Sequence, residues 1–431
     1  MVRIKVILSA TGPAWGYLFK KEERVRELED FQNILKAIQS RLPADLELEV
    51  HAFLDANDEL AFVNALSNND LVVYVALAFP TPGLNTILEK GVPLIFYQKM
   101  YAGHTWSIRP LRKGRTLLSM SSDPEDLRRK ILILYTYQKL SETKYVLITT
   151  KDRRDILERA DSLAERFNFQ PLILPPEELL KYYHNVSEEE AEKGAKAFVM
   201  KSIGVIEPSF EEIVKAYRMY LAMKKLVNDK KADGITIDCL SLFSKGLLPA
   251  YPCIGFSLLN NEGIPAACEG DVYSLFTMFI FKYLANLPSF ISDPVFDTAK
   301  NTVIHAHCVA ATMLDGAREY PYIIRSHAED NKGVSLEVKF EKIGALMTVA
   351  NYLDGNKMAV SLGKVVSNPE INRGCRTKIE LSVDNARRML ERWPGSPLVS
   401  PFGLHRVLAY GNWMNEIKDL CRLLEIEVFE E

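Results

Sequence analysis

The sequence of 431 residues lacks a charge excess, a long apolar run and the common nucleotide-binding motifs. Its 53 Lys and Arg residues nearly balance 56 Asp and Glu residues, which gives a net charge of −3. This balance provides no basic surface, so nucleic acid is not expected as a partner. No apolar run reaches the roughly 20 residues that a helix needs to cross a bilayer, so no membrane partner is expected. Neither GxGxxG nor GxxxxGK[ST] occurs, which removes the main support for dinucleotide or nucleoside triphosphate binding.

The sequence also lacks a pattern of closely paired cysteines. Its six cysteines are at positions 239, 253, 268, 308, 375 and 421. This distribution suits a reducing compartment. The first residues, MVRIKVIL, predict a strand and lack the small-residue cleavage site of a signal peptide. We therefore expect a soluble cytoplasmic protein.

The length exceeds what a single hydrophobic core usually organises, so two or three domains are expected. In the first third, apolar segments alternate with amphipathic ones. The predicted strands are 4–8, 46–53, 71–77, 92–97 and 116–120, and the predicted helices are 22–42, 59–66, 85–90 and 123–137. Continuously apolar strands between helices indicate a parallel sheet covered on both faces. This predicts an N-terminal α/β domain over residues 1–141.

The same alternation restarts after residue 141 and predicts a middle α/β domain over residues 142–290. Its predicted strands are 145–149, 170–174 and 234–238, and its predicted helices are 155–167, 187–201 and 209–228. Residues 253–261 are predicted as a strand or edge running into a turn. Residues 272–284 form a helix that is apolar nearly all round. Both domains are expected to be Rossmann-like α/β units.

Residues 291–431 have a different pattern of apolar and polar residues. Short, partly alternating segments are separated by turn signals and no helix is predicted between them, which indicates an antiparallel sheet or barrel. These segments are 322–327, 334–340, 345–353, 358–366 and 375–383. A closing helix is predicted to begin near His405. The third domain is therefore β-rich and barrel-like.

The candidate site lies in and after residues 264–308, where acids and histidines stand at the ends of apolar segments. Glu269 and Asp293 are separated by 24 residues, so spacing alone does not bring them together. A return across the helix to a neighbouring strand of one sheet would do so. Two carboxylates with one or two histidines suit Mn²⁺ or Co²⁺ better than Zn²⁺. The candidate histidines are His307 and His405.

Each of these residues also has a purely structural interpretation. Asp271 stands where it would cap the helix that follows. His305 and His307 share one strand face, and each can be a core histidine satisfied by a carbonyl. His405 can cap its own predicted helix.

The loop after the predicted strand 92–97 carries His104 and Trp106. Loops at the carboxyl ends of parallel strands commonly bind ligands. A stacking Trp beside a His suits a sugar, and the alternative is a Trp that anchors the loop to its own domain.

Several motifs carry a family resemblance. The run ACEGD, the segment SFISD, the strand HAHC, and the later motifs GCRT and HRVLAYGN occur in this order. In this order they resemble the L-fucose isomerase-like family and, more distantly, the L-arabinose isomerases. The resemblance covers most of the chain and implies two α/β domains followed by a β-rich domain. The chain is shorter than an L-fucose isomerase, mostly in its C-terminal half, which bears on the identity of the sugar.

The resemblance implies a site and a reaction. The Mn²⁺ ligands of the fucose type fall on Glu269, Asp293 and His405, and the arabinose type adds His307. Another divalent ion, such as Co²⁺ or Mg²⁺, could take the same position. The implied activity is aldose–ketose isomerisation of a free sugar through a cis-enediol, with Glu269 and Asp293 as the acid–base pair. Substrate-binding residues are expected at His104, Trp106, Arg376 and Asp271.

The resemblance also implies a homotrimer or homohexamer with sites near subunit contacts. Two other functional classes remain open. A sugar-binding or regulatory protein could use the same pair of α/β domains without a metal. A metal-dependent aldolase or epimerase could use the same ligands, but it would need a Lys or a further acid–base residue. Product analysis with a panel of aldoses separates the three classes.

Overall fold

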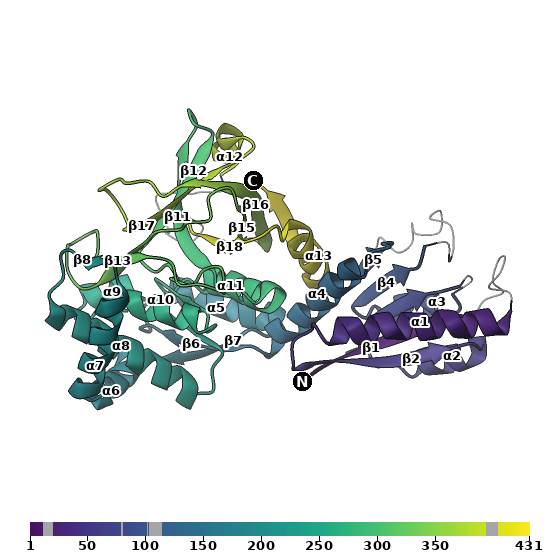
Figure 1. Ribbon diagram of the computed structural model, residues 1–431. Coiled ribbons are helices and arrows are strands. Elements are labelled where there is room, and N and C mark those ends of the chain that lie inside the picture. Colours follow the sequence, from purple (N-terminus) through teal and green to yellow (C-terminus); the bar gives the residue numbers. More distant parts are fainter. Residues whose placement is uncertain (12–19, 79–80, 101, 103–113, 394–403) are drawn as a thin grey trace. The chain divides into compact units, whose positions relative to one another are not determined.

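The computed structural model describes residues 1–11, 20–78, 81–100, 102, 114–393 and 404–431 (Figure 1). The chain folds as two compact units. The first unit comprises Met1–Lys139 and Asn415–Glu427, and the second comprises Leu140–Met414 and Val428–Glu431. Most of the closing helix α13 (Met414–Leu424) thus belongs to the first unit. The three-domain boundaries at residues 141 and 290 stay predictions. His104 and Trp106 lie outside the described residues.

The first unit contains a parallel sheet with the strand order β2-β1-β3-β4-β5. The strands are β1 (Val2–Ser9), β2 (Leu46–Phe53), β3 (Leu71–Ala76), β4 (Leu94–Gln98) and β5 (Thr116–Ser119). Its helices are α1 (Lys21–Gln39), α2 (Ala56–Asn64), α3 (Leu84–Lys90) and α4 (Pro124–Glu142). Strands β3 and β4 are buried along their whole length. Their continuous apolar sequences therefore correctly predicted a sheet covered on both faces.

The second unit begins with another parallel sheet, of order β10-β9-β6-β7. Its strands are β6 (Lys144–Ile148), β7 (Gln170–Leu174), β9 (Gly234–Ile237) and β10 (Ala266–Ala267). Its helices are α5 (Arg154–Phe167), α6 (Pro176–Asn185), α7 (Glu188–Lys201), α8 (Phe210–Asp229), α9 (Cys239–Ser244) and α10 (Cys253–Asn261). Parallel sheets in an α/β framework are thus confirmed in both units.

The prediction of a strand at residues 253–261 is wrong, because this segment is helix α10. Nearly all of its residues are buried, including Ile254, Phe256 and Leu259. A short, continuously apolar run does not distinguish a buried strand from a buried helix. Gly255 lets α10 pack closely on α8, since a Cβ added there would lie 2.6 Å from the Met223 sulfur.

The rest of the second unit is a closed antiparallel barrel. The strands follow the order β15-β18-β11-β12-β17-β16, and β16 pairs back onto β15. They are β11 (Phe290–Asp297), β12 (Thr302–His307), β15 (Leu346–Leu353), β16 (Lys357–Ser367), β17 (Thr377–Ser382) and β18 (Arg406–Tyr410). Phe290, Val349, Leu381 and Leu408 are among the apolar residues of its core cluster. The predicted barrel-like architecture is confirmed, since pairing of the first strand with the last removes the open edges.

Short elements complete this unit. Strand β19 (Glu427–Glu430) extends the barrel sheet beside β16. Strands β8 (Gly204–Val205), β13 (Tyr322–Arg325) and β14 (Ser335–Val338) form a separate small sheet. Helix α12 (Ala386–Arg392) packs against β11.

Helix α11 (Val272–Ala285) lies between the parallel sheet and the barrel of the second unit (Figure 1). It contacts β9 and β10 on one side and β11, β15 and β18 on the other. All of its residues except Lys282 and Ala285 are buried. This position explains why the helix is apolar nearly all round. The helix also fixes the distance between the two layers that supply the candidate site.

The closing helix does not begin at His405. His405 immediately precedes strand β18, and helix α13 starts at Met414, beyond Gly411 with a φ of 103°. The prediction of a helix start at His405 is therefore wrong. No described helix is both long enough and apolar enough to cross a membrane.

Candidate metal centre

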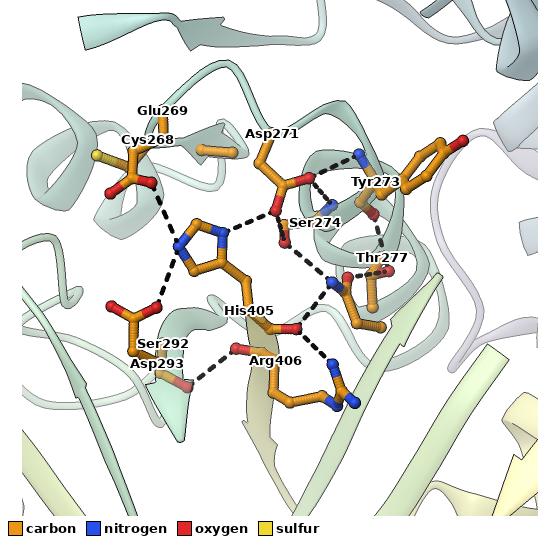
Figure 2. A network of polar contacts seen from close by, with 12 residues as sticks. Cys268, Glu269, Asp271, Tyr273, Ser274, Thr277, Ser292, Asp293, His405 and Arg406 are labelled. Carbon is orange, nitrogen blue, oxygen red and sulfur yellow. Dashed lines mark hydrogen bonds and ion pairs between the residues drawn. The ribbon is translucent and has the colours of Figure 1, made fainter. Parts of the chain in front are cut away.

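A tight turn after β10 presents the first carboxylate. Glu269 and Gly270 both have left-handed backbone conformations, with φ of 61° and 67°. The Gly270 N–H donates to the Ile237 carbonyl at 2.8 Å, which fastens the turn to β9. For a residue other than glycine this conformation costs roughly 1–2 kcal/mol. Such strain commonly marks functional sites, and here it directs the Glu269 carboxylate toward His405 (Figure 2).

Asp271 caps helix α11, as the sequence predicts. Its Oδ1 accepts from the N–H groups of Tyr273 and Ser274, both at 3.0 Å. Its Oδ2 accepts from the Ser274 hydroxyl at 2.6 Å and lies 2.8 Å from His405 Nδ1. The side chain is only 2% exposed, and both oxygens are engaged. Asp271 therefore lies behind His405 with both carboxylate oxygens engaged, and its contact with a substrate stays a prediction.

His405 joins three carboxylates (Figure 2). Its Nε2 lies 3.4 Å from Asp293 Oδ1 and 3.7 Å from Glu269 Oε2. Because Nδ1–H donates to Asp271, the neutral ring keeps the lone pair of Nε2 directed at the other two carboxylates. The hypothesis that His405 caps a helix is wrong. The ring has the orientation of a metal ligand held by a carboxylate.

His307, at the end of β12, has the opposite hydrogen-bonding arrangement. Its Nδ1 accepts from the Cys308 N–H at 2.9 Å, so the neutral ring carries its proton on Nε2. Nε2 lies 3.6 Å from Glu269 Oε1 and 3.9 Å from Asp293 Oδ2. It is buried and has no hydrogen-bond partner among the residues that the structure describes. In this tautomer the Nε2–H of His307 points into the site as a donor, and His307 as a metal ligand stays a prediction.

The electrostatics favour positive charge at the centre of the site. Burial acts to raise the pKa of Glu269, but His307 and His405 outweigh it and lower this pKa to about 2. Burial acts to lower the pKa of His405, but Asp271, Glu269 and Asp293 outweigh it and raise this pKa to about 10. The carboxylates thus stabilise a cation at Nε2 of His405. A divalent ion that replaces the Nε2 proton would be stabilised by the same carboxylates.

The donor set fits an ion of intermediate hardness. Donor atoms of Asp293, His307 and His405 lie within 4.8 Å of one another, as do those of Cys268, Glu269 and His307. The hydrogen bond to the Cys239 thiol and burial raise the pKa of the Cys268 thiol well above its usual range. A thiol with such a raised pKa binds a metal ion less readily than the neighbouring carboxylates do. The oxygen and nitrogen donors that remain suit Mn²⁺, Co²⁺ or Mg²⁺.

The site forms between two sheets, and the expectation that one sheet carries both acids is wrong. Glu269 follows β10 of the parallel sheet, whereas Asp293, His307 and His405 come from the barrel. Strand β11 pairs with β12 on one side and with β18 on the other. The barrel therefore brings three of the four residues to adjacent strands. Helix α11, which begins directly after the cap residue Asp271, connects the turn that carries Glu269 to strand β11 of the barrel.

Two other candidate residues have structural partners. Arg376 donates from Nε to the Ser326 carbonyl at 3.0 Å and from Nη2 to Asn331 Oδ1 at 3.1 Å. These hydrogen bonds hold the Arg376 side chain against the segment 326–331. His305 Nδ1 lies 2.9 Å from the Ser292 hydroxyl, and burial lowers its pKa to about 3. His305 is therefore a neutral core histidine, satisfied by a hydroxyl and not by the expected carbonyl.

Lys378, on β17, is not among the residues predicted from the sequence. The alternation of Lys378 and Glu380 with Ile379 and Leu381 indicates that it faces away from the barrel core. That alternation does not show which strands lie beside the one that carries Lys378. Strand pairing places it in the same cross-strand row as Asp293.

Comparison with known proteins gives matches to sugar isomerases. A sulfoquinovose isomerase from Clostridium sp. (strain MSTE9) is 25% identical over 262 residues, which cover 59% of this chain and 57% of that protein. Sulfoquinovose isomerases from Priestia aryabhattai and Priestia megaterium (strain ATCC 12872 / QMB1551) are 24% identical over 222 residues, which cover 50% of this chain and 48% of each. These matches support a sugar isomerase. The chain spans about half the length of the curated relatives that it matches.

Two further comparisons add no identification. No protein-family model matches the sequence. A solved sugar-binding protein of a sugar ABC transporter from Bacillus halodurans aligns with 66% of this chain and 88% of its own, at 11% identity and a TM-score of 0.15. That TM-score supports no conclusion about the fold.

Proposed function

We propose that the chain is a metal-dependent aldose–ketose isomerase that acts on a free sugar through a cis-enediol. The observation that carries the proposal is the convergence of Glu269 and Asp293 on Nε2 of His405, with Asp271 holding the opposite ring nitrogen. This arrangement directs Nε2 of His405 at two carboxylates, so that a divalent ion can replace the Nε2 proton there. The similarity to sulfoquinovose isomerases supports the same reaction class.

The side chains divide the reaction between them. Bound at Glu269, Asp293 and His405, a divalent cation would polarise the carbonyl and stabilise the negative charge of an enediolate. One carboxylate of the Glu269–Asp293 pair takes the proton from C2 and returns it to C1, while the other transfers the hydroxyl proton. The Nε2–H of His307 donates a hydrogen bond to a sugar oxygen. Its buried, unpartnered position among the described residues supports this role.

The substrate class follows from the relatives. Sulfoquinovose is an aldohexose that carries a sulfonate on C6, and its isomerisation requires the same proton transfer between C2 and C1. We propose an anionic aldohexose of this type as the substrate. The decisive experiment incubates the Mn²⁺-loaded protein with sulfoquinovose, glucose, L-fucose and L-arabinose. Ketose formation with solvent deuterium at C1 supports the proposal. Binding without turnover indicates a sugar-binding protein, and cleavage or epimerised aldose indicates the aldolase or epimerase class.

The two histidines provide a test of the metal centre. We expect His405→Asn to weaken Mn²⁺ binding by at least about tenfold, because it removes an oriented ligand. His307→Asn should keep the ion but lower kcat by about 10²-fold, because it removes a donor to the sugar. Isothermal titration with Mn²⁺ and ketose assays measure both. Equal loss of Mn²⁺ binding in the two variants would instead make His307 a ligand, as the resemblance to arabinose isomerases implies.

The assembly prediction rests on the family resemblance. We propose a homotrimer or homohexamer, because the family places its sites near subunit contacts. Light scattering at assay concentrations measures the mass, and each assembly form is then assayed separately. A stable monomer of the 48.9 kDa chain with full activity would contradict this prediction.

A further inference from the structure

A row of three side chains crosses the barrel beside the metal centre. Asp293 on β11 pairs with Ala306 on β12, and Ala306 pairs with Lys378 on β17. Residues paired across antiparallel strands project from the same face of the sheet. With strands about 4.8 Å apart, the backbones of Asp293 and Lys378 are roughly 10 Å apart. The residue between them in this row is Ala306, whose side chain is a single methyl group.

The side chain of Lys378 is a buried cation. The residue is 9% exposed, and its Nζ donates to the Cys375 carbonyl at 2.6 Å. Within the described part of the chain, no carboxylate oxygen lies at ion-pair distance from it. The neighbouring Glu337 already pairs with Arg325 and Lys339. Burial is the main cause of the lowered pKa of Lys378. An ammonium group in such a position is stabilised by an anion that it can bind.

Other cations nearby already have acidic neighbours. The pairs are Arg153–Asp238, Lys245–Asp152 and Arg376–Glu207. Arg153 also pairs with Asp155 at 2.9 Å, so two carboxylates offset its charge. An incoming anion would have to compete with these acids. Lys378 offers its charge without that competition.

We propose that Lys378 binds the anionic substituent at the end of the substrate remote from the metal centre, a sulfonate carried on C6. This inference rests on the proposed isomerase function. An extended six-carbon chain spans roughly 6 Å, given C–C bonds of about 1.5 Å, and the lysine side chain covers the rest of the separation. A sugar whose C1–C2 end lies at Asp293 thus extends over Ala306 toward Lys378. Lys378 then determines specificity for charged over neutral hexoses.

The test compares two substrates that differ only in the sulfonate, sulfoquinovose and its neutral 6-deoxy analogue quinovose. Lys378→Met keeps the length of the side chain and removes the charge. For sulfoquinovose we expect KM to rise about 10- to 100-fold, the range for loss of a charged hydrogen bond. Turnover of quinovose should stay within about twofold, which also shows that the variant is folded. Lys364→Met, at an exposed position on β16, is the matched control and should change neither substrate.

The possible outcomes separate the inference from the proposed function. If Lys378→Met lowers kcat/KM equally for both sugars, or for neither, Lys378 does not bind the sulfonate, while the isomerase function stands. A wild-type protein that isomerises only neutral sugars also overturns the inference. A wild-type protein that converts no aldose to ketose overturns the proposed function and the inference with it.

Discussion

Glu269→Gln and Asp293→Asn are each expected to lower kcat/KM for isomerisation by at least about 10³-fold. General acid–base catalysis alone contributes roughly 10²–10⁴-fold, and each variant also loses a charged oxygen at the metal centre. Both carboxylates lie within 4 Å of His405 Nε2. Neutralising either one therefore changes the charge around this nitrogen. Mn²⁺ binding should weaken in both variants.

The measurement is solvent-deuterium incorporation at C1 of the ketose, combined with Mn²⁺ titration. Glu391→Gln and Asp384→Asn are matched controls, because both acids are exposed in the same unit. The controls should retain activity and metal binding. Substantial activity in Glu269→Gln at saturating Mn²⁺ would remove Glu269 from the acid–base pair.

Asp271→Asn is expected to weaken Mn²⁺ binding by about 10- to 100-fold with little change in the melting temperature. Asn caps helices as well as Asp does, so the bonds to the first amides of α11 survive. The negative charge behind His405 Nδ1 is lost, and such partners of metal-bound histidines typically contribute this factor. If Asp271 served only as the helix cap, Asp271→Asn would leave both the melting temperature and Mn²⁺ binding nearly unchanged.

Asp271→Ala provides the comparison. It removes both the cap and the carboxylate, so it should lose metal affinity and also about 0.5–2 kcal/mol of unfolding free energy. Thermal unfolding in the presence of a chelator isolates the cap, and Mn²⁺ titration isolates the contact with His405. Wild-type affinity in Asp271→Asn would show that His405 is oriented by the backbone of β18 and not by Asp271.

Segments with an unambiguous apolar pattern could be predicted from the sequence. Strand β2 has the predicted bounds 46–53, and helix α11 differs from the prediction by one residue at its end. The segment 253–261 could not be assigned correctly, because burial on all sides removes the periodicity that separates helix from strand. The strand at 406–410 was hidden by the same effect, since all of its residues are buried.

The candidate ligands could be identified from motifs, but their arrangement could not. Asp271 and His405 are 134 positions apart, and no local pattern reports their hydrogen bond. Which nitrogen of each histidine faces the site depends on one neighbour, Asp271 for His405 and the Cys308 N–H for His307. Lys378 could be assigned to an outer strand face, but its position beside Ala306 requires the barrel register.

The position of β18 has a consequence for how the chain folds. Strand β18 lies between β11 and β15, which precede it in the chain by more than 50 residues. Closure of the six-stranded barrel into a ring of strands therefore depends on late, long-range pairing. During synthesis it is the last strand of the ring to emerge, and it brings His405 with it. A cation that binds only the closed ring favours that state by mass action. The bound ion would then stabilise the pairing of β18 with β11 and β15. Amide protons of β18 would exchange more slowly when the ion is bound.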